Sequence, residues 1–204
     1  MTTPRYALLI PVKDGSGAKS RLGVGSAAVR ARLMAAFARD AITAAAACDL
    51  VSVHVVGDAG GLTELLAGVD CQIVPDEGEG DLNRALVRAA ARVAAPGAGI
   101  AVMLADLPCL RTDDVRSLFA SAVGRCFVPD ASGTGTTFLL APAGTELDPH
   151  FGVGSAQAHA GTGAAAVALD HVSLRLDVDT TEDLTAALQF GVGARTAEVA
   201  ASLT

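Results

Sequence analysis

Three cationic side chains gather in one short segment of the chain, residues 11–22, which reads P-V-K-D-G-S-G-A-K-S-R-L. Lys13 and Lys19 are the only lysines of a chain that otherwise uses arginine, and Arg21 follows them. An apolar run, Tyr6–Val12, precedes the segment and an alanine-rich run follows it, so we expect a turn from a first strand into a first helix. Glycine amides and a helix N-terminus bind anions, and lysine suits phosphate oxygens. The segment predicts a phosphate site, and the alternative is a solvated loop.

The known phosphate-binding fingerprints do not fit this turn. A Walker A loop needs G-x-x-x-x-G-K-[ST], and the residues that lead to Lys19-Ser20 lack both glycines. The dinucleotide fingerprint G-x-G-x-x-G fails as well, because Gly15-Ser16-Gly17 is followed by Ser20. If the turn binds phosphate, it does so in another way.

Carboxylates follow two apolar segments later in the chain. Asp106 comes directly after I-A-V-M-L-A, and Asp177 and Asp179 lie in L-R-L-D-V-D-T. A carboxylate at the point where a central strand leaves the core suits Mg²⁺, which takes one or two carboxylates and leaves its other positions to phosphates and water. We expect Asp106 and Asp177 to be the ligands, with Asp179 as a water-mediated third. The alternative for Asp106 is a turn-forming role ahead of Pro108.

The role of Asp179 has a second interpretation. If Val172–Val178 is a strand, alternation sends Arg175, Asp177 and Asp179 to one face, where two acids repel unless a cation lies near them. Asp179-x-x-Glu182 also fits a helix N-cap with its reciprocal glutamate.

Two further motifs offer hydroxyls and backbone N–H groups to a small phosphorylated acid. Gly133-Thr134-Gly135-Thr136-Thr137 opens an apolar strand, and Phe151-Gly152-x-x-Ser155-x-x-x-His159 follows a proline turn. Each is weak alone, since threonine favours strands and Ser155 could cap a helix. We expect His54 and His171 to be structural and leave His159 open.

Apolar runs alternate with helical patterns along the chain, which predicts an α/β fold with a mostly parallel sheet flanked by helices. Asp81 should cap one helix and Thr112 another, and an acidic loop at 75–80 should be flexible. A long irregular connection should span Pro142–Leu169. The strands are expected at 6–12, 51–56, 71–74, 99–105, 125–129, 135–141 and 172–178, and the helices at 26–47, 62–67, 81–95, from 112 and 179–189.

Length, net charge and composition limit the class of protein. At 204 residues the chain should form a single domain over 1–204. Its net charge of −7 argues against nucleic acid or an anionic membrane as a partner, and its apolar runs fit no membrane span. The four cysteines are widely spaced, so we expect reduced, mostly buried thiols and a cytoplasmic location. The oligomeric state stays open, and a homodimer is compatible with these totals.

Taken in order, the motifs resemble those of a known family, the 2-phospho-L-lactate guanylyltransferases. The shared patterns are P-V-K-x-x-x-x-A-K-S-R-L, Asp81-Leu82-Asn83, L-A-D-L-P, G-T-G-T-T, F-G-x-x-S-x-x-x-H and D-V-D-T-x-x-D-L, over roughly residues 5 to 195. The bacterial branch of the family uses phosphoenolpyruvate. The resemblance implies a glycosyltransferase-A-like, Rossmann-like nucleotidyltransferase fold and a place in coenzyme F-420 biosynthesis.

The resemblance also implies residue roles. Lys13, Lys19 and Arg21 would hold the phosphates of GTP, and Asn83 would lie at the guanosine. The magnesium ligands would be Asp106 and Asp177 with Asp179, and the phosphorylated acid would lie at Thr136, Gly152 and Ser155. The first turn, with its glycines at positions 15 and 17, departs from the family loop, which often has a leucine there.

The sequence therefore predicts a guanylyltransferase. A phosphate oxygen of phosphoenolpyruvate attacks the α-phosphorus of GTP in line and pyrophosphate leaves, with Mg²⁺, Lys19 and Arg21 offsetting the charge of two polyanions. We choose phosphoenolpyruvate over 2-phospho-L-lactate and 3-phosphoglycerate because the arginine- and alanine-rich composition looks actinobacterial. Two competing hypotheses are a cytidylyl- or molybdopterin-type transferase and a nucleotide-binding regulatory domain without turnover.

We predict that Lys19→Ala lowers the turnover number by about a hundredfold or more, the scale of losing one preorganised electrostatic group. Steady-state release of pyrophosphate from GTP measures it. Turnover within a fewfold of the parent would remove Lys19 from the mechanism.

Overall fold

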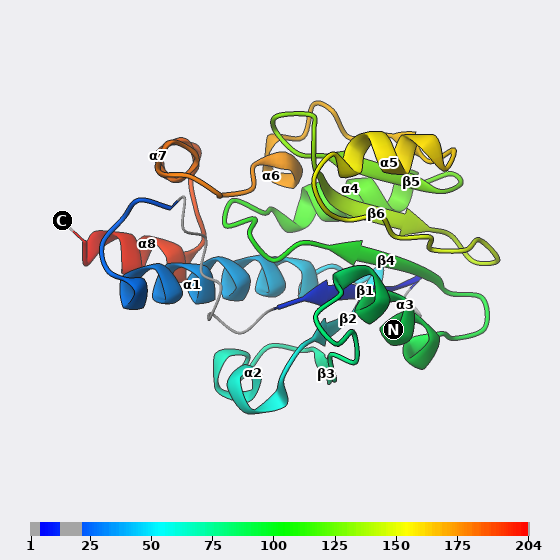
Figure 1. Ribbon diagram of the computed structural model, residues 1–204, viewed down its shortest axis with the longest axis horizontal. Helices are drawn as coiled ribbons and strands as arrows, with labels where there is room; N and C mark the ends of the chain where they lie inside the picture. Colours follow the sequence, from blue (N-terminus) through cyan, green and yellow to red (C-terminus); the bar gives the residue numbers. More distant parts are fainter. Residues whose placement is uncertain (1–4, 13–21, 204) are drawn as a thin grey trace.

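One seven-stranded sheet organises the computed structural model, which describes residues 5–12 and 22–203 (Figure 1). The strand order is β3-β2-β1-β4-β6-β5-β7, and β6 alone runs antiparallel to its neighbours within that sheet. The expected α/β fold with a mostly parallel sheet is confirmed. The strands are β1 (Tyr6–Pro11), β2 (Val51–Val56), β3 (Gln72–Val74), β4 (Gly99–Met103), β5 (Cys126–Pro129), β6 (Thr136–Ala141) and β7 (Ala165–Ala166).

Helices cover both faces of this sheet. Side chains of α1, α2, α4 and α6 form an apolar cluster with one face, and those of α3 and α5 pack on the other. Helix α8 lies alongside α1, and α7 joins the same end of the molecule (Figure 1). The helices are α1 (Ala27–Ala46), α2 (Ala59–Leu65), α3 (Leu82–Val93), α4 (Thr112–Ser121), α5 (Ser155–Gly161), α6 (Val172–Arg175), α7 (Thr181–Phe190) and α8 (Ala194–Ala201).

The order of the strands places a crevice beside β1 and β4. Strands β1, β2 and β3 progress toward one edge of the sheet, and the chain then returns to add β4 on the other side of β1. In open sheets of this type, ligands bind beyond the carboxyl ends of the strands at such a reversal. Because β6 runs antiparallel to β4, the start of β6 lies at the same edge as the end of β4. The motifs that follow β1 and β4 and precede β6 therefore share one edge.

Side-chain caps fix two helix starts at this edge. The Ser26 hydroxyl accepts a hydrogen bond from the Val29 N–H (3.4 Å), and the Asp81 carboxylate accepts one from the Arg84 N–H (3.0 Å). These bonds satisfy donors that the first helical turn leaves without partners. The cap predicted at Asp81 is confirmed.

The strand expected at Val172–Val178 is wrong, because its first half forms the short helix α6. The Arg175 guanidinium donates to the carbonyl oxygens of Pro129 (3.0 Å), Asp130 (2.8 Å) and Leu169 (2.7 Å). These bonds tie α6 to the end of β5 and to the segment that precedes α6. Of the alternating apolar residues that suggested a strand, Leu174 packs in one apolar cluster, and Leu176 and Val178 pack in another. Strand β7 takes the place beside β5.

Two predicted caps are also wrong, each by one residue. The box that starts α7 pairs Thr180 with Asp183 rather than Asp179 with Glu182. Arg111 occupies the cap position of α4, and the Thr112 hydroxyl donates to the Ala44 carbonyl instead (2.9 Å).

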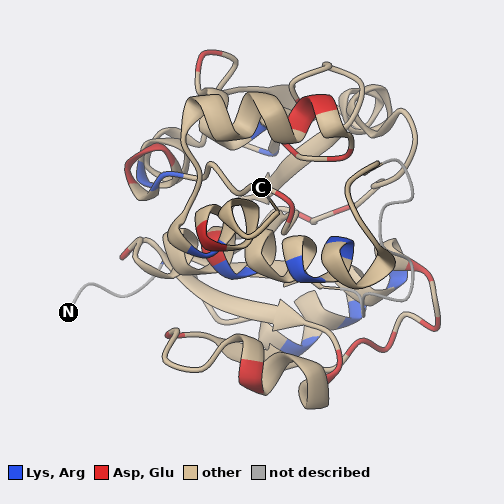
Figure 2. Cartoon of the chain, turned by 90° about the vertical axis from the view of Figure 1, so that its left-hand side faces the viewer, with Lys and Arg blue, Asp and Glu red and all other residues tan. Residues whose placement is uncertain are grey.

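The acidic loop at 75–80, which we expected to be flexible, makes several bonds with α3. Arg84 Nε donates to the Gly78 carbonyl (2.7 Å), Arg88 donates to the Glu77 carbonyl, and Arg92 pairs with the Glu77 carboxylate (2.6 Å). Figure 2 shows acidic segments of the chain next to basic helical turns. The expected irregular connection, Pro142–Leu169, likewise contains α5 and β7.

All four cysteines are free thiols, and three of them are buried. Burial raises the pKa of the Cys109 and Cys126 thiols to about 11. Among the described helices, none combines the length and apolarity that crossing a bilayer needs. The single continuous sheet supports our proposal that the chain forms one domain.

We predict that Thr180→Ala lowers the free energy of unfolding by about 1 kcal/mol, because the Asp183 N–H loses its capping acceptor. Urea unfolding measures the change. Thr185→Ala, at an exposed position inside the same helix, is the matched control and should stay within about 0.5 kcal/mol of the parent. Equal effects of the two substitutions would contradict the capping role.

Candidate active site

Three carboxylates meet at the carboxyl edge of the sheet. Asp106, Asp177 and Asp179 each offer an oxygen, and these oxygens all lie within 4.8 Å of one another. Asp106 and Asp177 are half-buried, and Asp179 is exposed. The expected metal ligands are thus brought together, although the strand that was expected to align two of them does not exist.

A backbone hydrogen bond joins the two chain segments that carry these acids. The Val178 N–H donates to the Asp106 carbonyl at 3.0 Å. The next residue after Asp106, Leu107, and Val178 itself are both fully buried, so their side chains anchor the two segments in the core. This anchoring holds the neighbouring carboxylates close together.

Such close carboxylates repel one another in the absence of a cation. Three oxygen donors at this spacing match the preference of hard divalent cations such as Mg²⁺ for carboxylate ligands. The donor set therefore fits a divalent cation.

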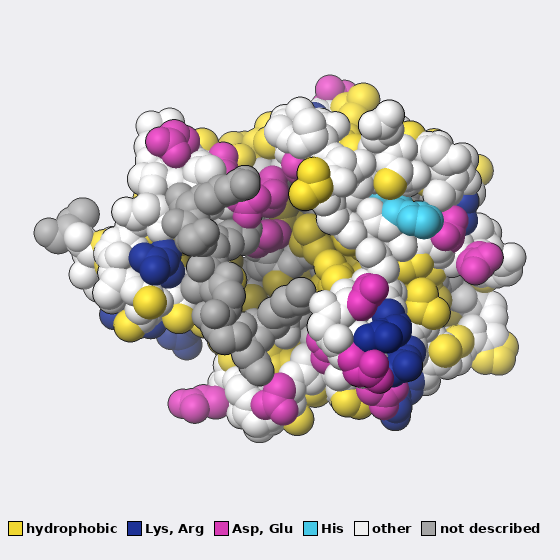
Figure 3. All heavy atoms as spheres, viewed as in Figure 1, with side chains coloured by type: hydrophobic (Ala, Val, Ile, Leu, Met, Phe, Trp, Pro, Cys, Tyr) yellow, Lys and Arg dark blue, Asp and Glu magenta, His cyan; other side chains and the backbone are white. Residues whose placement is uncertain are grey.

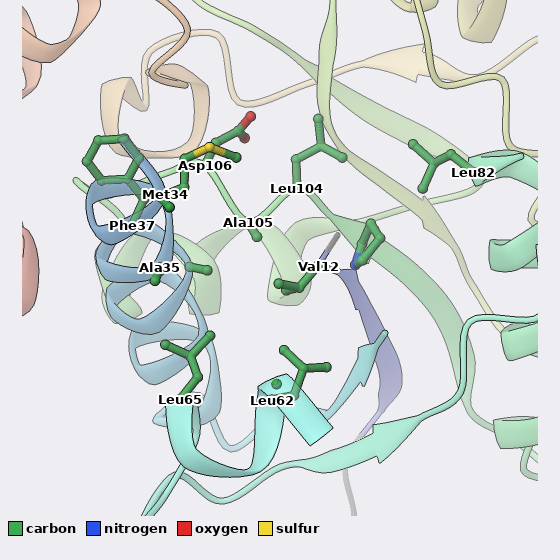
Figure 4. A pocket seen from close by; sticks show the side chains of 14 residues that line it. Val12, Met34, Ala35, Phe37, Leu62, Leu65, Leu82, Leu104, Ala105 and Asp106 are labelled. Atoms are coloured by element: carbon green, nitrogen blue, oxygen red, sulfur yellow. The ribbon is translucent and has the colours of Figure 1, made fainter. Parts of the chain in front are cut away.

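A mostly apolar cavity of about 350 Å³ lies next to this cluster, and Asp106 forms part of its wall. In Figure 4, Asp106 lies at one side of the cavity, and Leu62 and Leu65 lie at the opposite side. Figure 3 shows acidic side chains beside a hollow whose floor is hydrophobic. Asp106 thus borders a recess. Other lining residues come from α1 (Met34 and Phe37), the exit of β4 (Leu104) and the start of α3 (Leu82).

The predicted acid-binding residues form a second group at the same edge. The Leu104 N–H donates to the Thr137 carbonyl (2.9 Å), which fixes the start of β6 next to the segment that leads to Asp106. The Ala156 N–H donates to the Thr134 carbonyl (3.1 Å), so α5 begins against the same segment. Ser155 is the first residue of α5 and is buried.

Glycine is required in the turn that leads to Ser155. Gly152 and Gly154 have φ angles of 139° and 72°, a region that residues with a Cβ rarely adopt. The Ser155 N–H closes the turn on the Gly152 carbonyl (3.1 Å). The alternative role of Ser155 as a helix cap is not seen, because the cap position is Gly154 and carries no side-chain bond.

Asn83, expected at the guanosine, makes a paired contact with the chain itself. Its amide nitrogen donates to the Phe151 carbonyl (3.0 Å), and its amide oxygen accepts from the Phe151 N–H (2.8 Å). The side chain therefore ties the start of α3 to the segment that contains Gly152. A role at the base stays a prediction.

Lys13, Lys19 and Arg21 lie outside the described residues. Strand β1 pairs in parallel with β4, so its last residue, Pro11, lies at the same edge as the exit of β4. The convergence of these cations with the carboxylates stays a prediction.

Sequence reasoning left His159 open, yet its ring is completely buried and joins two parts of the site. Its Nδ1 lies 2.9 Å from the Thr136 Oγ1, and its Nε2 accepts from the His150 N–H (2.9 Å). The only signal in the sequence is its place in the F-G-x-x-S-x-x-x-H motif. His171, as expected, is structural and pairs with Asp114 (3.1 Å).

Comparison with known proteins decides the class of this site. Residues 6–204 match the family model described as guanylyl transferase CofC like. The chain belongs to the CofC-like guanylyl transferase family. The predicted nucleotidyltransferase class is confirmed.

Named relatives cover nearly the whole chain. A protein of Streptomyces coelicolor named phosphoenolpyruvate guanylyltransferase is 44% identical over 98% of this chain and 97% of its own length. A protein of the same name from Thermomonospora curvata is 41% identical over 97% and 90%. A solved structure from Desulfovibrio desulfuricans, assigned to the nucleotide-diphospho-sugar transferases, has a TM-score of 0.71 at 17% identity and covers 98% and 95%. That likeness shows the shared fold.

We predict that Asn83→Ala lowers the free energy of unfolding by about 1–3 kcal/mol, because two backbone groups of the half-buried Phe151 segment lose their partners. Denaturant unfolding measures this change, and hydrogen exchange should show faster exchange of the Phe151 amide. Gln157→Ala, which removes an exposed amide from α5, is the control. It should change neither the free energy of unfolding nor the exchange rate of the Phe151 amide. An unchanged Phe151 exchange rate would show that the pair does not hold the segment.

Proposed function

We propose that this chain transfers the guanylyl group of GTP to phosphoenolpyruvate, in coenzyme F-420 biosynthesis. A phosphate oxygen of phosphoenolpyruvate attacks the α-phosphorus of GTP, the bond from that phosphorus to the β-phosphate oxygen breaks, and pyrophosphate leaves. The product is enolpyruvyl-diphospho-guanosine. The names of the relatives at 41–44% identity support this choice of substrates.

The observation that carries the proposal is the meeting of two groups at one edge of the sheet. The carboxylates of Asp106, Asp177 and Asp179 lie at the exit of β4, and the hydroxyl of Thr136 opens the antiparallel β6 beside that exit. The carboxylates would bind the triphosphate through a metal ion, and the Thr136 hydroxyl would bind the phosphorylated acid. An in-line attack needs its two polyanionic reactants to be held side by side in this way.

The three carboxylates would hold Mg²⁺. When bound, Mg²⁺ neutralises the phosphate oxygens and stabilises the charge that develops on the leaving pyrophosphate. The chain's own residues would do the rest: Lys13, Lys19 and Arg21 bind the phosphates, while Thr136, Gly152 and Ser155 orient the acid. The attacking phosphate is already ionised at neutral pH, so the reaction needs no general base.

The acceptor is tested by mass spectrometry of the products from GTP, Mg²⁺ and an equimolar mixture of phosphoenolpyruvate, 2-phospho-L-lactate and 3-phosphoglycerate. We expect the guanylyl adduct of phosphoenolpyruvate to dominate. A dominant adduct of another acid would replace the acceptor and leave the transferase assignment in place. No guanylyl adduct with any acid would contradict the proposed reaction.

We predict that Asp106→Asn and Asp177→Asn each lower the turnover number by about a hundredfold, because each removes a charged ligand from the metal. Both should also weaken Mn²⁺ binding, measured by calorimetry on the GTP-bound protein. Asp170→Asn makes the same charge change at an exposed position away from the cluster and should leave both quantities unchanged. Mn²⁺ binding that is equal in all three variants would exclude the cluster as the metal site.

A further inference from the structure

His159 lies in an apolar enclosure behind the group that we assign to the phosphorylated acid. Its side chain is 0% exposed, and its ring packs against Phe151 (centroids 5.1 Å apart) and Phe127 (5.9 Å). Both ring nitrogens nevertheless have polar partners. A buried imidazole with two directed bonds has a defined orientation and a defined tautomer.

The partner of Nε2 determines that tautomer. The His150 backbone N–H can only donate, so Nε2 must be the acceptor and carry no proton. In the neutral ring the proton then lies on Nδ1, 2.9 Å from the Thr136 Oγ1. His159 therefore donates, and the Thr136 hydroxyl oxygen accepts.

The neutral form of the ring is the one favoured by its surroundings. Burial is the main cause that lowers the pKa of His159 to about 4, and the nearby His150 and Arg125 lower it further. Asp148, which contacts both His150 and Arg125, and a hydrogen bond with the Ser155 backbone act in the opposite direction. At neutral pH the ring is uncharged, and its single proton lies on Nδ1.

This tautomer determines where the hydrogen of the Thr136 hydroxyl can point. A hydroxyl has one hydrogen to donate and two lone pairs with which to accept. With one lone pair filled by His159, its own hydrogen cannot point at Nδ1, and no other partner of the Thr136 Oγ1 is seen in the part of the chain that the structure describes. The hydrogen is left for an acceptor outside this network.

We propose that His159 is a positioning residue that makes the Thr136 hydroxyl a hydrogen-bond donor to the anionic group of the bound phosphorylated acid. The inference rests on the proposed function, because it places that acid at Thr136. With the opposite tautomer, the hydroxyl would donate to His159 and present only lone pairs to an anion. The imidazole thus sets the polarity of a hydroxyl that it holds from behind.

Two amide substitutions separate this role from a purely structural one. In His159→Asn, the side-chain N–H₂ can take the place of Nδ1 and still donate to Thr136, while the acceptor for the His150 N–H is lost. In His159→Gln, the amide oxygen can reach the place of Nε2 and keep that acceptor, while the donor to Thr136 is lost. If His159 only holds the His150 segment in place, the glutamine variant should be closer to the parent than the asparagine variant.

The experiment measures KM for phosphoenolpyruvate, KM for GTP and the thermal midpoint of the parent and both variants. We expect His159→Gln to raise KM for phosphoenolpyruvate about tenfold or more, the scale of a hydrogen bond to a charged group, with KM for GTP unchanged. His159→Asn should stay within about threefold of the parent, since it retains the donor. In a Thr136→Val background, His159→Gln should cause no further rise.

A KM for phosphoenolpyruvate that rises equally in both variants, or more in the asparagine variant, would overturn the inference. A second measurement needs no variant: ¹⁵N chemical shifts of histidine-labelled parent protein report the His159 tautomer directly. A protonated Nδ1 with an unprotonated Nε2 supports the inference, and the reverse overturns it, whether or not the variants fold.

The two levels of the proposal fail differently. A parent protein that forms no adduct with any of the three acids overturns the proposed function, and with it this inference. A parent that is active on phosphoenolpyruvate, with variants that are indistinguishable from each other, overturns the role of His159 alone.

Discussion

The close approach of three carboxylates is the constraint on which this edge of the sheet depends. Asp106, Asp177 and Asp179 come from segments about 70 residues apart in the chain, and a backbone hydrogen bond from Val178 to Asp106 joins those segments. Buried side chains next to the acids, Leu107 and Val178, anchor the two segments in the core. The core thus holds the three carboxylates at one place, where their oxygens suit a divalent cation.

The antiparallel strand β6 brings the second half of the site to the first. A parallel strand at this position would begin at the far edge of the sheet, and Thr136 would lie there with it. Because β6 runs antiparallel to β4, Thr136 lies beside the exit of β4. There the side chains of Asn83 and His159 bind backbone groups of the 150–151 segment. Helix α3 therefore supports the segment assigned to the acid as well as the recess beside the acids.

Sequence patterns predicted most of the sheet and the residues at its carboxyl edge, because buried strands and capped helices leave local signals. Asp81 caps α3 as its type and position indicate. The segment at 172–178 was mispredicted because its alternating apolar residues do not line one face of a sheet: Leu174 packs in one cluster and Val178 in another. The paired contact of Asn83 with Phe151 and the bond of His159 to Thr136 join residues that are far apart in the chain. No local sequence pattern predicts such contacts.

We propose that cations from the first turn and carboxylates from the exit of β4 and the 177–179 segment hold one triphosphate. A crystal structure of the chain with Mn²⁺ and a non-hydrolysable GTP analogue tests it most directly, since anomalous scattering locates the metal. We expect Mn²⁺ to be bound to Asp106, to Asp177 and to the triphosphate, with Lys19 on the same phosphates. Mn²⁺ or a triphosphate bound away from these carboxylates would contradict it.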